Sequence, residues 1–102
     1  MFYHAALGPP RADGLTLVQL KFGDPANNDL IVPDAIKAIQ ALNLKGGLGI
    51  LFDGRASVPV AMAIAHLVAH LYQFVACADP KMGKFVVVIS HTPNHRPGDL
   101  IE

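Results

Sequence analysis

The stretch from residue 54 to residue 91 constrains the fold most, because its polar groups stand only at the ends of apolar segments. It reads GRASVPVAMAIAHLVAHLYQFVACADPKMGKFVVVISH. Burying a polar group without a partner is costly. The apolar segments are therefore expected to form core helices and strands. The few titratable side chains would then gather at the ends of those elements, where they can form a site.

Length and composition predict one domain spanning residues 1–102, with more apolar surface than a monomer hides. The hydrophobic fraction is 52% and the charged fraction is 16%. Because a chain of this size with so many apolar residues cannot bury them all, we expect a second copy to cover part of its surface. The formal net charge is zero, which argues against binding of long nucleic acid through a broad basic field.

Nothing in the sequence indicates secretion or insertion into a membrane. The start, MFYHAALGPP, lacks the basic beginning of a signal peptide, and no uncharged apolar run approaches the ~20 residues that span a bilayer. Cys77 is the only cysteine and lies in the apolar run QFVACA, so an inert core thiol is expected. The lack of a disulfide framework fits a reducing cytoplasm.

The apolar patterns predict an α/β fold with the element order β-β-α-β-α-β-β. Strands are expected at residues 2–7, 15–22, 49–52, 74–78 and 85–90, with a short extended piece at 99–102. One helix should begin at Pro33, and a second should run from a Ser57 cap to about Tyr72. Strands that alternate with helices favour parallel neighbours, and ligands then bind beyond the carboxyl ends of strands. Arg55 and Asp79 fall just after such ends.

Histidines are the first candidates for chemistry. His66 and His70 are four residues apart and would share one face of the second helix. Such a pair can ligate a metal but needs further ligands, so a structural role stays open. His91 follows the last long strand and could either cap that strand or face a ligand.

A second group of polar residues suits a phosphate. The Gly54-Arg55 turn, followed by Ser57 at a helix start, offers backbone N–H groups and a guanidinium to an anion. Asp79 could start a turn, or orient a water, a histidine or a cation. Lys81 could be solvated or placed beside a phosphate. In combination these residues indicate phosphodiester cleavage, and with RNA the attacking oxygen can be the 2′-OH of the substrate.

Three runs resemble one protein family: GR-x-x-x-P-x-A-x-x-x-AH, then H-x-Y-x-F-VA-x-x-DPK-x-G-x-x-VVV-x-SH, then PGD-x-I. They are similar to the small CRISPR-associated ring nucleases of type III systems, firmly from Gly54 to about Ile101 and loosely before. The resemblance implies a single Rossmann-like domain. It also implies an RNA nuclease that linearises the second messenger cyclic tetra-adenylate and so switches off antiviral signalling.

The same resemblance implies roles for individual residues and partners. His70, Asp79 and Lys81 would be catalytic, and Asp79 and His70 would also hold Mn²⁺, with Mg²⁺ as the alternative. The residues that would line the cyclic nucleotide are Gly54, Arg55, Ala56, Ser57, His66 and His91. Homodimers are implied, with two dimers sandwiching the ring.

Three departures from the family pattern keep other functions open. Ala56-Ser57 replaces the usual Gly-Pro, and Lys81 replaces an arginine and so loses its bidentate fork. The segment from His70 to Phe74 lacks the usual His/Thr/Pro pattern, and His70 is also displaced by one residue, because the family usually spaces its two histidines three apart. The alternatives are a non-catalytic sensor or sponge for cyclic oligoadenylate and a manganese-dependent exonuclease acting on RNA 3′ ends.

Overall fold

A single six-stranded sheet organises the chain, as seen in the computed structural model, which describes residues 1–102. The elements are β1 (Tyr3–Leu7), β2 (Thr16–Phe22), α1 (Asn28–Gln40), β3 (Gly47–Gly54), α2 (Val58–Val68), β4 (Tyr72–Asp79), β5 (Lys84–Ser90) and β6 (Leu100–Ile101). The predicted α/β class and element order are confirmed, and the expected extended piece at the C-terminus is β6.

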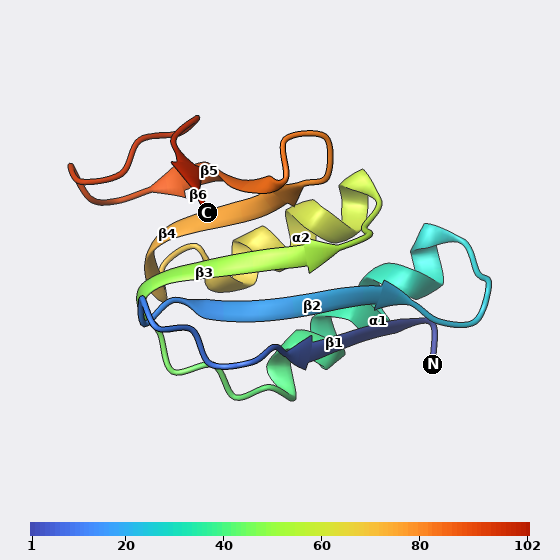
Figure 1. The fold of residues 1–102 in the computed structure, drawn as a ribbon. Helices are drawn as coiled ribbons and strands as arrows, with labels where there is room; N and C mark the ends of the chain where they lie inside the picture. The colour runs from blue at the N-terminus through green and yellow to red at the C-terminus, as the bar shows by residue number, and fades with distance from the viewer.

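The strands lie side by side in chain order, and only the middle three are parallel. β2 pairs with β3 and β3 with β4 in parallel, whereas β1, β5 and β6 join as antiparallel neighbours. Crossovers between parallel strands share one hand. Because strand order advances in one direction, α1 and α2 both fall on the same face of the sheet (Figure 1).

The core is divided between the two faces of the sheet. On the helix-covered face, Ile64 and Val68 of α2 and Ile39 of α1 belong to a cluster of twelve buried residues. On the other face, Phe74 and Val87 belong to a smaller cluster of five. No helix covers that second face. Partly buried side chains of β5 and β6 pack against this smaller cluster instead.

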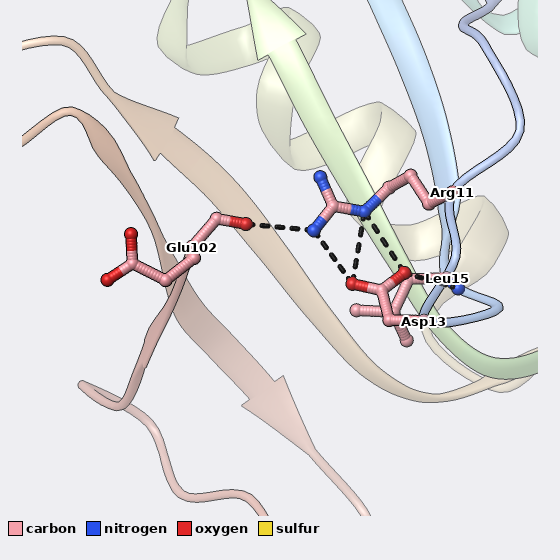
Figure 2. A network of polar contacts seen from close by, with 4 residues as sticks. All are labelled: Arg11, Asp13, Leu15 and Glu102. Atoms are coloured by element: carbon pink, nitrogen blue, oxygen red, sulfur yellow. Dashed lines mark hydrogen bonds and ion pairs between the residues drawn. The ribbon is translucent and has the colours of Figure 1, made fainter.

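A polar network closes the second face. The Arg11 guanidinium donates to the Asp13 carboxylate at 2.7 Å and to the Glu102 carbonyl oxygen at 2.8 Å (Figure 2). Its central carbon also lies 5.5 Å from the centre of the Phe85 ring, within range of a cation–π contact. The hydrogen bonds from Arg11 lower the pKa of Asp13. The loop after β1 is thereby tied to the C-terminal end of the chain.

The start of the first helix differs from the prediction. α1 begins at Asn28 and contains Pro33 in its interior. Ile31, in the turn before the proline, is buried in the core, so packing extends the helix back past the residue that resembled its first position. Asp34 does not serve the helix start. Its carboxylate accepts the N–H groups of Phe2 and Tyr3 at 2.6 and 3.0 Å, which holds β1 against α1.

The second helix ends earlier than predicted. α2 stops at Val68 and β4 begins at Tyr72. The turn between them is closed by the Leu71 N–H donating to the Val68 carbonyl and by the Gly47 N–H donating to the Leu71 carbonyl. The residues that were expected to extend the helix therefore form the turn and the start of β4, which pairs with β3. His70 lies in this turn, so His66 and His70 do not share a helix face.

The prediction that Cys77 lies in the core is also wrong. Its thiol is exposed, because α2 leaves that part of β4 uncovered. The surrounding apolar groups nevertheless desolvate it and raise the pKa of the thiol, which opposes a reactive thiolate. Neither helix of this chain is long and apolar enough to cross a membrane.

Candidate functional site

The carboxyl ends of β3 and β4 bring several predicted site residues together. The last pair of the β3–β4 ladder joins Phe52 with Cys77 in parallel register, and Asp53 and Asp79, just beyond it, line the same cavity. Arg55 directly follows β3 and Lys81 lies in the turn after β4. We call this region, defined by Gly54, Arg55, Asp79 and Lys81, the aspartate edge.

The Gly54-Arg55 turn is shaped by the sheet. Gly54 has φ of 117°, and a Cβ there would collide with the Leu20 carbonyl oxygen of β2, so glycine is required by the backbone. The Tyr3 hydroxyl donates to the Arg55 carbonyl oxygen, and burial raises the pKa of Tyr3 to about 12. The main chain of Arg55 is thus fixed while its side chain is exposed.

The start of α2 has fewer free backbone N–H groups for binding an anion than the sequence predicted. The Ser57 hydroxyl accepts the Val60 N–H at 3.3 Å and donates to the Asn28 side-chain oxygen at 2.8 Å. The Ala61 N–H already bonds to the Ser57 carbonyl, and Pro59 has no N–H. Of the first turn, only the Val58 N–H remains available to an anion. Ser57 therefore caps α2 and joins it to α1, and Ala56 is an exposed turn residue beside it.

Asp79 organises the turn that carries Lys81. One of its carboxylate oxygens accepts the Lys81 N–H at 2.9 Å and the Met82 N–H at 3.3 Å. The second oxygen has no hydrogen-bond partner. The ion pairs of the chain link Met1 with Asp24, Arg11 with Asp13 and Lys84 with Glu102. The Arg55 and Lys81 side chains therefore have no ion-pair partner within the chain.

Asp53 is a site residue that the sequence analysis did not single out. It lines a cavity of about 230 Å³ together with Asp79 and Lys84, and its side chain is exposed. The signal was present, because Asp53 also stands at the end of a buried strand beside the Gly54-Arg55 turn. Two carboxylates, Asp53 and Asp79, therefore share one small cavity with the Lys84 side chain.

His70 and His91 lie at the end of the sheet opposite to the aspartate edge. His91 follows β5, which runs antiparallel to β4, and its N–H donates to the Gln73 carbonyl at 2.8 Å. Its ring Nε2 bonds the Ala69 carbonyl at 2.8 Å, which requires a proton on that nitrogen. The His70 ring stacks on it, with the ring centres 5.5 Å apart. We call the group of Ala69, His70 and His91 the histidine edge.

The aspartate edge and the histidine edge are far apart within one subunit. The eight residues of β4 separate them, and at about 3.3 Å per residue the separation is on the order of 25 Å. His66 is exposed in the last turn of α2, also away from the Gly54-Arg55 turn. No group of three or more His, Cys, Asp or Glu side chains could hold a metal. His70 and Asp79 therefore do not form a shared metal site within one chain.

Comparison with known proteins finds one family whose model matches most of the chain. None of the curated proteins matches this sequence. The family model described as CRISPR-associated protein (Cas_csx3) matches residues 25–102. The match covers about three quarters of the chain and includes both edges. This protein therefore belongs to the CRISPR-associated Cas_csx3 family.

Proposed function

We propose that this protein is a cytoplasmic ring nuclease that binds cyclic tetra-adenylate and linearises it, ending type III CRISPR antiviral signalling. The observation that carries the proposal is the aspartate edge. There Arg55 follows β3 and Lys81 comes two residues after Asp79, the last residue of β4, and neither cation has an ion-pair partner. Cations beside a carboxylate suit a phosphodiester, whose charge grows in the transition state.

The proposed cleavage is an internal transfer. The 2′ oxygen of one ribose forms a bond to phosphorus while the bond from phosphorus to the 5′ oxygen breaks. The free oxygen of Asp79 accepts the 2′-OH proton, and a His70 imidazolium returns a proton to the leaving 5′ oxygen. Lys81 and Arg55 offset the charge on the phosphoryl oxygens. The products are linear oligoadenylates with a 2′,3′-cyclic phosphate.

Two subunits are needed for this mechanism. His70 and Asp79 stand at opposite edges of one sheet, so His70 must come from a second copy. A homodimer, with two dimers enclosing the ring, would meet this need because a four-fold ligand offers identical contacts to identical subunits. Dependence on Mn²⁺ stays a prediction of the resemblance. One chain does not gather a ligand set, and no step is assigned to a metal.

A non-catalytic sponge is the second candidate, and the same separation of the two edges favours it. A chain that never brings His70 to Asp79 could still hold the ring through Arg55 and Lys81. An exonuclease acting on linear RNA 3′ ends is the weaker alternative, because the net charge of zero gives long RNA no broad basic field.

The test is chromatography of cyclic tetra-adenylate after incubation with the purified protein, with manganese or with a chelator. We expect linear products that depend on the metal, and little cleavage of linear oligoadenylate supplied in parallel. Intact ring that co-elutes with the protein would support the sponge. Intact ring without binding would refute both, and preferred degradation of the linear substrate would indicate the exonuclease.

A further inference from the structure

Lys84 stands directly opposite Asp79 in the sheet. The antiparallel ladder of β4 and β5 pairs these two residues, and the side chains of such a pair lie on the same face, with their Cβ atoms about 5 Å apart. Lys84 also lines the cavity of about 230 Å³ that contains Asp53 and Asp79. Lys81, the lysine that the sequence indicated, is not among the residues that line this cavity. Lys84 is therefore the lysine that strand register places beside Asp79.

The ion pair that Lys84 makes within the chain is exposed. Its Nζ lies 3.1 Å from a carboxylate oxygen of Glu102, and the two side chains are 39% and 86% exposed. Such a pair contributes little to stability, because water screens the attraction and both long side chains lose freedom. The ammonium of a lysine sits on a flexible four-carbon stem. Lys84 can therefore exchange Glu102 for another anion at small cost.

The main chain on both sides of this ion pair is held by other contacts. The backbone of Lys84 is fixed by its pairing with Asp79. The Glu102 carbonyl oxygen accepts a hydrogen bond from the Arg11 guanidinium at 2.8 Å (Figure 2). Loss of the ion pair therefore leaves the two strands in place and changes only which anion the Lys84 ammonium contacts.

The charge of Lys84 decides the sign of the aspartate edge. The two carboxylates of the cavity offset the two cations Arg55 and Lys81, so those four groups sum to zero. While Glu102 neutralises Lys84, the edge as a whole stays neutral. Once Lys84 is released from Glu102, the edge carries one net positive charge, which favours a phosphate group.

We propose that Lys84 is a phosphate-binding residue of the aspartate edge and that a phosphate of the ligand displaces Glu102 from it. The ammonium would donate to a non-bridging phosphoryl oxygen, and Glu102 would return to Lys84 when the ligand leaves. The inference deepens the proposed function, on whose ligand it rests. It adds a cation to which the family resemblance assigns no role, and a carboxylate that competes with the ligand.

The test is calorimetric titration of the full chain with cyclic tetra-adenylate in the presence of a chelator, with chromatography to verify that the ring stays intact. Lys84→Met should raise the Kd about tenfold, because a charge-assisted contact is lost. Glu102→Gln should lower the Kd about two- to threefold, because the competing carboxylate is removed. The double variant should match Lys84→Met, since Glu102 acts only through Lys84.

Lys37→Met is the matched control. Lys37 is an exposed lysine of α1 without an ion pair, and its loss should change the Kd by less than about twofold. Salt dependence gives a readout that a merely structural role would not move. Each lost lysine–phosphate contact should lower the slope of log Kd against log salt concentration by roughly 0.7, in Lys84→Met and not in Lys37→Met.

Three results would overturn the inference, provided that circular dichroism shows each variant to be folded. The first is a Kd and a salt slope for Lys84→Met equal to those of wild type. The second is weaker binding in Glu102→Gln, which would make the ion pair a structural requirement of the site. The third is an equal loss of affinity in Lys37→Met, which would reduce the effect to net charge.

The two proposals fail separately. A protein that shows these shifts in Kd but never cleaves the ring would support the inference and count against the proposed cleavage alone. A protein that cleaves the ring but responds to neither Lys84→Met nor Glu102→Gln would count against the inference alone. A wild type that does not bind the ring would refute both, because no phosphate would then reach Lys84.

Discussion

The two edges of the sheet carry most of the polar residues singled out from the sequence, yet they differ in how those residues are held. At the aspartate edge, Arg55 and Lys81 have no partners, and Asp79 keeps one oxygen free. At the histidine edge, the His91 ring is bonded to the Ala69 carbonyl and stacked on His70. One edge leaves its charged groups unpaired, and the other fastens β5 to the end of α2.

This difference indicates that each end of the sheet in one subunit carries one half of the proposed active site. Proton transfer requires groups within hydrogen-bond reach of the reacting oxygens, and β4 keeps His70 far from Asp79. If both residues serve one phosphate, the phosphate lies between subunits. Activity and stability should then respond differently to changes at the two edges.

The largest effect is expected from Asp79. Replacing it by Ala should lower the rate of cyclic tetra-adenylate cleavage by about 10²-fold or more, because the carboxylate is proposed to accept a proton, while binding of the ring persists. Asp79→Asn keeps an oxygen acceptor for the Lys81 and Met82 N–H groups and controls for the turn. Turnover in Asp79→Asn near that of wild type would remove Asp79 from the mechanism.

Mixing two inactive variants tests whether the edges cooperate between subunits. Asp79→Ala and His70→Ala should each be inactive alone, and an equal mixture should regain on the order of a quarter of the wild-type rate, since half of the pairs are mixed and each has one intact site. Cleavage assays before and after subunit exchange measure it. A mixture as inactive as its components would place both residues in one subunit or remove one of them from the reaction.

A smaller effect is expected on stability at the histidine edge. His91→Ala should lower the free energy of unfolding by about 1 kcal/mol, because it removes a hydrogen bond to the Ala69 carbonyl. His66→Ala is the matched control. His66 is an exposed histidine of α2 that makes no hydrogen bond, and its loss should cost under about 0.5 kcal/mol. Equal urea midpoints for the two variants would contradict a fastening role for His91.

The smallest effect concerns a carboxylate outside both edges. Hydrogen bonds from the Phe2 and Tyr3 N–H groups lower the pKa of Asp34. A lowered folded-state pKa stabilises the fold above the unfolded value of about 3.9, and this contribution is lost as the pH falls through the folded pKa. Wild type should therefore lose more stability than Asp34→Asn between about pH 5 and pH 3. Parallel acid titrations of the two proteins would contradict the assignment.

The α/β class was predictable because each element carried its own local pattern. The alternation in LTLVQLKF predicted β2, and the β-branched run before Ser90 predicted β5. The ends of elements were less predictable. Pro33 resembled a helix start, but burial of Ile31 carried α1 past it. His70 resembled a helix residue until pairing of β4 with β3 ended α2 at Val68.

The candidate site was predictable residue by residue, and its arrangement was not. The ends of strands indicated Arg55 and Asp79, and parallel register puts the ends of β3 and β4 at the same edge of the sheet. Ser57 was read as part of an anion site, whereas its hydroxyl is occupied by Val60 and Asn28. The partner Asn28 lies 29 residues away in the chain, so no local pattern could have indicated that this hydroxyl was taken.

The sequence by itself determined the order of helices and strands, the family, and the residue types that could meet a phosphate, because these depend on local pattern and composition. Only the tertiary structure decided which of those residues are neighbours. Parallel pairing of β3 and β4 brings Asp53 and Asp79 to one cavity, while the antiparallel turn to β5 brings His91 back to His70. Distances between residues remote in the chain are fixed by strand direction and register, and no single segment of sequence contains that information.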